Sequence, residues 1–373
     1  MTRREWLALI SAAPLLKAAD TNAPAAPVSI AKCASYDEDV TAILATMFGQ
    51  LGGLERLVRN KTVTVKINMT GSPGQKFRGM APAITHYTHP KVIGATAYLM
   101  GRAGAKRIRF VESSWGTGGP LEDEMLNSGW NLRTLQSGAP GVEFENTNAL
   151  GKGKKYARFM VPSKAYMYPG YDLNHAYDEC DVFVSMAKLK NHATCGVTLS
   201  LKNCYGILPA SIYGDSAGVD EPNEKPVDGR LKVGHEGRRQ PSKSAPQELH
   251  FGENHDPGYR VPHIVADLSA ARPIHLQIID GVETVAGGEG PWIRGLRAIK
   301  PGLLIAGLNP VCTDAVSVAA MGYSPRATRG TAPFQTCDNT LLLAEGHGVG
   351  TTDLKRIEVV GVPIDQAMYK FEA

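Results

Sequence analysis

Lysine, amide and acidic side chains stand directly after four short apolar segments of the sequence. The positions are Lys66 and Asn68, Glu112 and Ser113, Lys188, Lys190 and His192, and Asp280. Each apolar segment has the composition of a buried strand, and ligands of open parallel sheets bind beyond the carboxyl ends of the strands. We therefore expect these side chains to line one lysine-rich cleft, which suits a small ligand with a carboxylate or phosphate group.

Every member of this set also has a plain structural interpretation. Lysines at strand ends are often only solvated, and Lys188 and Lys190 share one face if their strand continues. Asp280 and Gly281 can form an ordinary turn, and Glu112 can cap a following helix. The sequence leaves both interpretations open.

His192 differs from the other histidines because it follows an apolar segment and two lysines. Nearby positive charge lowers the pKa of an imidazole and favours its neutral form. A neutral imidazole can act as a base or bind a metal. We expect His192, Lys190 and Asp280 to be catalytic, with Asp280 as the acidic counterpart of His192 or a second ligand. A histidine with a purely structural role is the alternative.

Residues 194–206 carry further polar side chains. Their apolar residues alternate as in a strand, whereas Thr194, Thr198 and Lys202 recur every four residues as in a helix. Both patterns place Thr198 and Lys202 on one side. We expect Thr198, Lys202 and Asn203 to bind the ligand, and the sequence does not decide between strand and helix.

Histidines at metal-ligand spacing occur in two loops. His86 and His89 are three residues apart, but a third ligand is missing from the sequence around them. Four more histidines gather in a later connection: His235, His250, His255 and His263. Solvated loop histidines explain both groups without a metal, so metal and cofactor stay unknown. The sequence has neither a P-loop ending nor a nucleophile elbow.

Strands and helices alternate along the chain. Strands are expected at residues 62–67, 106–111, 181–187, 274–279, 303–306 and 356–360, and helices at 36–58, 90–103, 263–271, 310–321 and 340–345. Pro90 suits the first position of a helix, and Gly104 suits the residue after its end. Strand, helix and strand with a short turn form a βαβ unit. We predict an α/β fold with a mostly parallel sheet, flanking helices and long strand-to-helix loops.

Two connections in this scheme are unusually long. Residues 68–89 join a strand to a helix, and residues 208–261 contain few apolar runs. Long connections inside compact domains are usually lids, binding loops or disorder. Residues 214–260 are either a lid or a surface insertion without chemistry.

Composition excludes several classes of protein. The chain has 373 residues, of which 43% are hydrophobic and 20% charged, so bulk disorder is excluded. A net charge of +4 is too small for nonspecific nucleic-acid binding. Apolar runs fall short of the roughly 18 residues that a membrane span needs. Six cysteines occur without a Cys-x-x-Cys pair, which favours buried thiols.

The first 26 residues have the pattern of an export signal. Arg3 and Arg4 precede a short, weakly apolar stretch, which resembles a twin-arginine signal. The residues Ala23-Pro24-Ala25 offer a cleavage site. We therefore expect a periplasmic or otherwise exported protein, without a membrane span once the signal is removed. A frayed amphipathic N-terminus is the alternative.

The polar blocks combine with several glycine and proline positions into a larger pattern. Its parts are Lys66-x-Asn68, His89-Pro90, Lys188-Leu189-Lys190-Asn191-His192, residues 196–203 with Gly206, Asp280-Gly281, Gly290-Pro291, and Asn309-Pro310 followed by Asp314-Ala315. The pattern resembles the family of domain of unknown function 362 over about residues 60–325. The Lys-x-Lys-x-His block with Leu201-Lys202-Asn203 is its most specific part.

The resemblance implies one α/β domain, which we expect over residues 27–373 with an irregular insertion at 208–261. Some family members are joined to ferredoxin modules, which implies a redox setting and allows a redox partner protein. This sequence carries no such module. The first strand, helix and strand also follow the order of nickel-pincer lactate racemases, without a shared motif.

Together these features predict an exported enzyme that acts on a small carboxylate- or phosphate-bearing ligand, with or without a cofactor. Its reaction would be an isomerisation or a redox step assisted by a partner. The alternatives are a non-catalytic periplasmic anion-binding protein and a redox accessory protein.

Overall fold

The computed structural model describes residues 22–150 and 155–372. Most of the expected export signal, including Arg3 and Arg4, lies outside these residues. The carbonyl oxygen of Ala23 accepts a hydrogen bond from Arg356 Nη2 at 2.7 Å, and that of Pro24 accepts one from the Thr351 amide at 3.0 Å. The residues at the expected cleavage site are therefore packed onto the rest of the chain.

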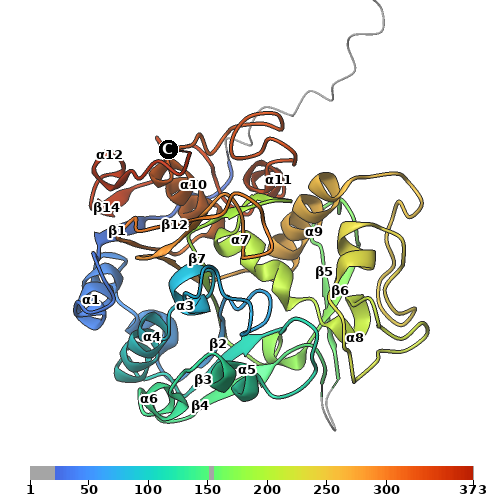
Figure 1. The fold of residues 1–373 in the computed structure, drawn as a ribbon, viewed down its shortest axis with the longest axis horizontal. Helices are drawn as coiled ribbons and strands as arrows, with labels where there is room; N and C mark the ends of the chain where they lie inside the picture. The colour runs from blue at the N-terminus through green and yellow to red at the C-terminus, as the bar shows by residue number, and fades with distance from the viewer. Residues whose placement is uncertain (1–21, 151–154, 373) are drawn as a thin grey trace, which may run out of the picture.

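An eight-stranded sheet runs through the molecule in the order β14-β1-β13-β10-β7-β2-β3-β4 (Figure 1). Its strands are β1 Val28–Lys32, β2 Thr62–Lys66, β3 Arg107–Glu112, β4 Val142–Asn146, β7 Val182–Lys188, β10 Leu276–Gly281, β13 Leu303–Gly307 and β14 Val359–Gly361. Five neighbouring pairs are parallel, and β13 runs opposite to both β1 and β10. The predicted α/β fold with a mostly parallel sheet is thereby confirmed.

Two strands of this sheet were absent from the sequence prediction. β1 is a short strand that pairs with β13 and β14. β4 lies at the edge and carries Glu143 and Glu145, which lower its apolar content. Polar edge strands give a weak sequence signal because only one side of their ladder is covered.

The central strands separate two apolar cores, because successive side chains of a strand point to opposite faces. In β7, Val182 and Val184 belong to one core, whereas Phe183 and Ala187 belong to the other. Continuous apolar runs of this kind are typical of parallel strands that are covered on both sides.

One face of the sheet is covered by α1 Val40–Gln50, α2 Glu55–Val58, α4 Pro90–Arg102, α5 Leu121–Asn127 and α6 Leu132–Gln136 (Figure 1). Asp39 caps α1 by accepting the Ala42 amide, and Pro90 opens α4 as predicted. The single helix expected over residues 36–58 is wrong. The chain turns at Gly52 and Gly53, both with positive φ, and this separates α1 from α2.

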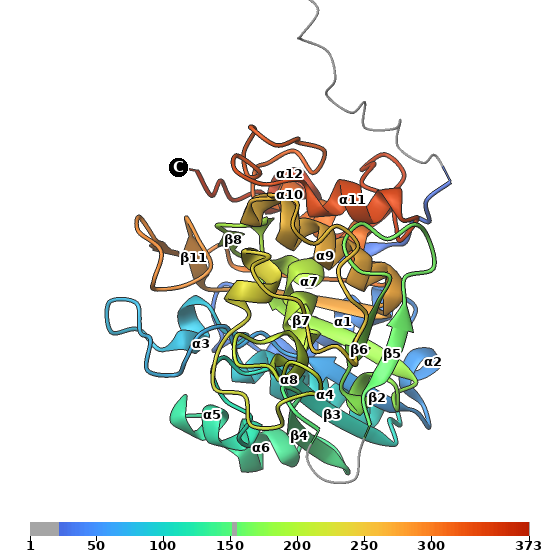
Figure 2. The same cartoon turned by 90° about the vertical axis from the view of Figure 1, so that its right-hand side faces the viewer.

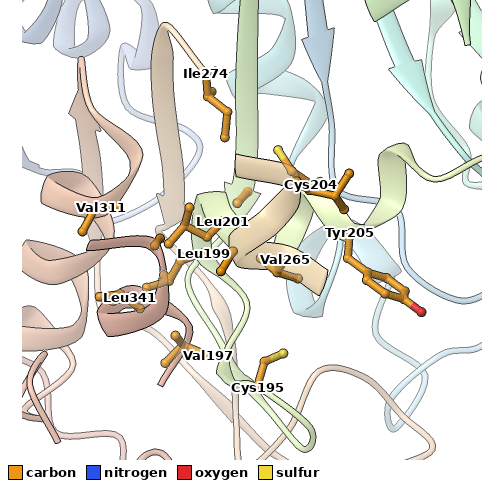
Figure 3. Close-up of a cluster of buried hydrophobic side chains, with 14 of the residues drawn as sticks. Cys195, Val197, Leu199, Leu201, Cys204, Tyr205, Val265, Ile274, Val311 and Leu341 are labelled. Atoms are coloured by element: carbon orange, nitrogen blue, oxygen red, sulfur yellow. The ribbon is translucent and has the colours of Figure 1, made fainter. Parts of the chain in front are cut away.

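The other face is covered by α7 Leu199–Asn203, α9 Pro257–Ala271, α10 Pro310–Ala320 and α11 Thr340–Gly346. Figure 3 shows Leu199 and Leu201 of α7 beside Val265, Val311 and Leu341 of the three longer helices. α9 begins six residues before the predicted start at residue 263, because Asp256 caps it and Pro257 takes its first position.

The segment over residues 194–206 combines the two patterns that the sequence offered. β9 Gly196–Val197 pairs with β8 Asn191–His192, and α7 follows directly. Leu199 marks the change with a φ of +43°, in the left-handed region. Asp314 of α10 fixes the start of α7, since its carboxylate accepts the Ser200 and Leu201 amides at 2.9 Å each.

Smaller elements complete the fold. They are two-stranded sheets of β5 Ala157–Met160 with β6 Gly170–Leu173 and of β11 Thr284–Ala286 with β12 Arg297–Ile299, and helices α3 Pro82–Thr85, α8 Ala210–Tyr213 and α12 Ile364–Ala367. Two short 3-10 helices, η2 His175–Tyr177 and η3 Cys204–Ile207, and a π-helix, η4 Leu231–His235, are also present. Figure 2 shows the chain between α8 and α9 as a long yellow loop on the viewer's side, interrupted by η4.

All six cysteines lie within the described residues as free thiols, and five of them are buried. None of the helices in the described ranges is long and apolar enough to cross a bilayer.

Candidate functional site

A cavity of about 650 Å³ opens beyond the carboxyl ends of β2 and β3 and beside α7. Nine of the eleven predicted site residues line it: Lys66, Asn68, Glu112, Ser113, Lys190, His192, Thr198, Lys202 and Asn203. The carboxyl ends of parallel strands meet at one edge of the sheet, and this brings residues far apart in sequence together.

Lys66 and Glu112 form an ion pair in the cavity wall. Lys66 Nζ lies 2.6 Å from Glu112 Oε1 and donates to the Ile67 carbonyl at 2.6 Å. Glu112 Oε2 accepts the Met69 amide at 2.7 Å. A Cβ at position 206 would lie 3.1 Å from Lys66 Nζ, so Gly206 leaves the room that this pair needs. The ammonium group of Lys66 and both carboxylate oxygens of Glu112 are thus bonded within the protein. The two side chains therefore stabilise the cavity wall and leave little charge for a ligand.

Asn203 ties α7 to the strand ends. Its Oδ1 accepts hydrogen bonds from Lys66 Nζ at 3.3 Å and from Asn68 Nδ2 at 3.2 Å. Its Nδ2 donates to Ser185 Oγ at 3.0 Å. Within the described chain, Asn68 Oδ1 is buried without a hydrogen-bond donor. Asn203 is thus a positioning residue, whereas Asn68 keeps an acceptor free.

Ser113 is engaged with other hydroxyl groups. Its Oγ lies 2.8 Å from Thr147 Oγ1, which in turn lies 3.0 Å from the hydroxyl of Tyr177. This chain of buried hydroxyls fixes Ser113 at the cavity wall.

Lys190 is fully buried, yet it lines the cavity. Its Nζ donates to the carbonyl oxygens of His86 at 2.7 Å and Glu289 at 3.0 Å. Burial lowers the pKa of Lys190 well below its usual value. Two acceptors suit a neutral amine, which has two N–H donors and one lone pair, so Lys190 can present a basic nitrogen.

His192 is also held neutral. Burial, followed by the charge of Lys202, lowers the pKa of His192 well below its usual value. The Thr194 amide donates to His192 Nδ1 at 3.1 Å, so Nδ1 is the acceptor and the proton of the neutral ring resides on Nε2. His192 can therefore donate a hydrogen bond to a ligand from Nε2. The predicted role as a base finds no support in this geometry, because Nδ1 is already occupied.

Glu289 is the carboxylate beside His192, with 3.9 Å between its Oε2 and His192 Nδ1. It accepts the Ala193 amide at 2.9 Å and Trp292 Nε1 at 2.8 Å. Burial would raise the pKa of Glu289, but the adjacent His192 and these hydrogen-bond donors outweigh burial and lower the pKa below its usual value. Glu289 was not among the predicted site residues, although its position in a glycine-rich turn close to Asp280 was a usable signal.

Thr198 and Lys202 project from the start and the end of α7. Thr198 Oγ1 is buried and has no partner among the residues described. Lys202 Nζ lies 4.5 Å from the ring centroid of Tyr205, and the described residues give it neither a carboxylate nor a hydrogen-bond acceptor. Burial lowers the pKa of Lys202. Among the residues described, its ammonium group therefore has neither an ion-pair partner nor a hydrogen-bond acceptor.

The long connection before α9 forms the outer wall of the cavity. Arg230 and His235 come from it, and so do Asp215 and Asp228. Arg230 donates to the Leu208 carbonyl at 2.6 Å and to Asn148 Oδ1 at 2.6 Å. Of the two interpretations of this segment, the lining position favours a lid. The sequence did not single out Arg230, because nothing in its neighbourhood distinguishes it from a solvated arginine.

Lys188 and Asp280 are not among the described residues that line the cavity. They form a separate, fully buried ion pair, with 2.9 Å between Lys188 Nζ and Asp280 Oδ2. Asp280 Oδ1 accepts the Tyr36 hydroxyl at 2.7 Å, and Oδ2 accepts the His89 amide at 2.9 Å. The expected pairing of Asp280 with His192 is therefore replaced by this separate cluster. β7 ends at Lys188, so Lys188 and Lys190 do not share a face as a continued strand would require.

The described residues contain no group of three His, Cys, Asp or Glu side chains that could hold a metal ion. His86 Nδ1 lies 2.8 Å from Thr85 Oγ1, and the His89 ring stacks on Tyr36 at 3.6 Å. Burial lowers the pKa of His86 to about 2. The two histidines of the first loop thus have structural contacts of their own.

Fold and site together define an α/β protein with a polar cavity at the carboxyl edge of a mostly parallel sheet. The family model described as domain of unknown function (DUF362) matches residues 63–319, which is more than half of the chain. The chain belongs to this family.

Two further comparisons give similarities to individual proteins. The thylakoid-associated protein sll1697 of Synechocystis sp. (strain ATCC 27184 / PCC 6803 / Kazusa) is 28% identical over 188 residues, which cover 50% of this chain and 51% of that protein. The match thus spans about half of the length of this relative. The lactate racemase apoprotein from Thermoanaerobacterium thermosaccharolyticum matches with a TM-score of 0.34 and 10% identity, over 75% of this chain and 55% of that one.

Proposed function

We propose that the cavity binds a small ligand with a carboxylate or phosphate group, and that the protein is an enzyme acting on this ligand. The observation that carries the proposal is the ammonium group of Lys202. It lines the cavity, and among the residues described no carboxylate forms an ion pair with it, although Glu289 acts on its charge from a greater distance. A cation without an ion-pair partner in a partly desolvated site favours an anionic ligand.

Other cavity groups supply the hydrogen bonds that such a ligand needs. His192 would donate from Nε2, and the hydroxyl of Thr198 can donate or accept. The free Oδ1 of Asn68 would accept from a hydroxyl or amino group of the ligand. These three groups with Lys202 would recognise an anion that carries a second polar group.

Lys190 would be the catalytic residue. A neutral amine at the wall of the cavity can take a proton from a bound ligand, and burial, which lowers the pKa of Lys190, favours this neutral form. Proton removal next to a carbonyl or hydroxyl group would serve an isomerisation. It would equally serve a redox step in which a partner protein or a cofactor accepts the electrons.

The test is a thermal-shift screen with small carboxylates and phosphomonoesters, followed by calorimetric titration of the strongest ligand. Lys202→Met should weaken binding by roughly 10- to 100-fold, which corresponds to the loss of one hydrogen bond to a charged group. Lys355→Met is the control, because Lys355 is exposed and does not line the cavity. Equal binding by both variants would contradict the proposal.

A turnover assay then separates the enzyme from a binding protein. Lys190→Met should retain ligand binding and lose turnover, since Lys190 is assigned to chemistry and Lys202 to affinity. Tight binding without chemistry would favour the anion-binding protein. A co-purifying redox protein together with an empty cavity would favour the accessory role.

We also propose that the protein is exported. Support comes from the arginine pair Arg3-Arg4 ahead of a short apolar stretch. The test is fractionation of a bacterium with a twin-arginine pathway that produces the full chain. The protein should appear in the periplasm, and replacement of both arginines by lysine should keep it in the cytoplasm. An unchanged location of the variant would contradict the proposal.

A further inference from the structure

A second group of polar side chains lies away from the cavity, where Ser163, His347 and Asp267 form a hydrogen-bonded chain. Ser163 Oγ is 2.6 Å from His347 Nδ1, and His347 Nε2 is 2.9 Å from Asp267 Oδ1. None of the three belongs to the described lining of the cavity. The three residue types in this order are those of a serine nucleophile, its base and the acid that orients the base.

The three side chains come from three different elements. Ser163 lies in the connection between β5 and β6, Asp267 lies on α9, and His347 directly follows α11. α9 packs against α11, and this places Asp267 and His347 next to each other. The arrangement is therefore built by tertiary packing, and no local sequence motif reveals it.

The positions of the protons follow from the hydrogen bonds. An ionised carboxylate only accepts, so His347 Nε2 carries the proton that is shared with Asp267. In the neutral ring Nδ1 is then the acceptor, and the hydroxyl of Ser163 donates to it. This is the arrangement in which an imidazole can take the serine proton, with the two ring nitrogens exchanged relative to the usual triad.

Asp267 is fully buried and held by several donors. Its Oδ2 accepts the Met167 amide at 2.7 Å and the Tyr171 hydroxyl at 3.3 Å, and its Oδ1 accepts the Tyr166 amide at 2.8 Å. The Tyr166 and Met167 amides belong to the same connection that carries Ser163, and Tyr171 belongs to β6 directly after it. One carboxylate thus orients the histidine and fixes the loop of the serine.

His347 is shielded from solvent, whereas Ser163 is accessible to it. The side chain of His347 is only 2% exposed, and the ring of Tyr166 lies against it with 4.3 Å between the ring centroids. Ser163 is exposed to solvent. Within the described chain, the backbone amides of Lys164 and Ala165 have no hydrogen-bond acceptor. The amide after a nucleophilic serine is a frequent oxyanion donor.

We propose that Ser163, His347 and Asp267 form a serine-type acyl-transfer site for carboxylic esters presented at the protein surface. Ser163 Oγ attacks the ester carbonyl carbon, and its proton passes to His347 Nδ1. The tetrahedral intermediate expels the alcohol, which takes that proton, and leaves the acyl group on Ser163. Water attacks this acyl ester in the same way, releases the carboxylic acid and restores the serine.

The test uses the intact protein with a fluorophosphonate, which phosphonylates activated serines with release of fluoride, and with p-nitrophenyl acetate. One phosphonyl group per chain is expected, located by peptide mass analysis at Ser163. Ser163→Ala should abolish labelling and ester hydrolysis. Because Ser163 is exposed, this variant should keep the thermal stability of the wild type.

Two further variants give the test its controls. Ser137→Ala removes another exposed serine and should label at the wild-type rate. His347→Gln should slow labelling by at least roughly 100-fold, the scale of general-base assistance. If His347→Gln fails to fold, Asp267→Asn provides the same comparison. Labelling of Ser163 no faster than of Ser137, or a rate independent of both the histidine and the aspartate, would overturn the proposal.

Discussion

Lys188 and Lys202 lie near the same edge of the sheet but have opposite surroundings. Lys188 Nζ donates to the Tyr36 hydroxyl at 2.7 Å, the Ala83 carbonyl at 3.0 Å and Asp280 Oδ2 at 2.9 Å. These acceptors use all three donors of its ammonium group. Lys202, at the end of α7, lies over the ring of Tyr205 and has no such acceptor among the residues described.

The comparison shows that burial of a lysine does not by itself indicate a binding site. Lys188 and Asp280 satisfy each other and hold together β7, β10 and the first long loop. Lys202 leaves its charge to the cavity. The two lysines are distinguished by the number of hydrogen bonds that the ammonium group still has to make.

The largest effect on stability is expected when the buried ion pair of Lys188 and Asp280 is broken. Lys188→Met leaves Asp280 buried without its cation and should lower the free energy of unfolding by about 3–5 kcal/mol. Chemical denaturation measures this loss. The double variant Lys188→Met/Asp280→Asn removes both charges and should recover more than half of it. A loss of less than about 1 kcal/mol for Lys188→Met would remove the distinction between the two lysines.

An intermediate effect is expected at Gly206, which separates the Lys66–Glu112 pair from α7. In Gly206→Ala the new methyl group would meet Lys66 Nζ at 3.1 Å and Glu112 Oε1 at 3.2 Å. Overpacking of this kind should cost about 1–3 kcal/mol in the free energy of unfolding. Gly74→Ala is the matched control, since no atom lies within 4 Å of its added Cβ. Equal stability of both variants would show that Lys66 and Glu112 move aside at no cost, which would contradict the predicted overpacking.

A smaller effect on stability is expected when Lys202, which has no ion-pair partner, is replaced. Lys202→Met deletes a partly desolvated charge that has no protein partner, so the free energy of unfolding should stay within about 1 kcal/mol of the wild type or rise. Thermal and chemical denaturation of the variant beside Lys188→Met measure the contrast. A loss as large as that of Lys188→Met would assign Lys202 a structural role.

The smallest effect is expected for the change of ligand affinity with pH near neutrality. Burial lowers the pKa of Lys202, so its charge is present below that value and is lost as the pH rises toward 10.5. Affinity for a carboxylate ligand should therefore decline on the alkaline side. Burial also lowers the pKa of His192 well below 6.5, so its imidazole should gain no charge, and affinity should not rise, as the pH falls just below 6.5.

Calorimetric titration at acid and alkaline pH tests both expectations, and Lys202→Met should remove the alkaline decline in affinity. A rise in affinity below pH 6.5 would instead indicate that protonated His192 binds the anion.

Much of this architecture could be predicted from the sequence. Apolar runs that end in Lys66, Glu112 and Lys188 located three strands, and Pro90 located a helix start. Their common edge followed from the rule for parallel sheets, which gave six of the lining residues: Lys66, Asn68, Glu112, Ser113, Lys190 and His192. Local patterns sufficed here because strand ends are fixed by the backbone.

The partner of each side chain could not be predicted in the same way. Whether Lys188 turns toward Asp280 or toward the cavity depends on where β7 stops and on Tyr36, which lies 152 residues away along the chain. Glu289 and Arg230 come from loops without periodic patterns. Such contacts are set by tertiary packing, and hydrophobic periodicity carries no information about them.

A crystal structure of the protein with the strongest carboxylate or phosphate ligand tests the central claim most directly. We expect an anionic oxygen within about 2.7–3.2 Å of Lys202 Nζ, with the Lys188–Asp280 pair unchanged. A ligand that leaves Lys202 untouched, or that binds by opening the Lys188–Asp280 pair, would contradict the account.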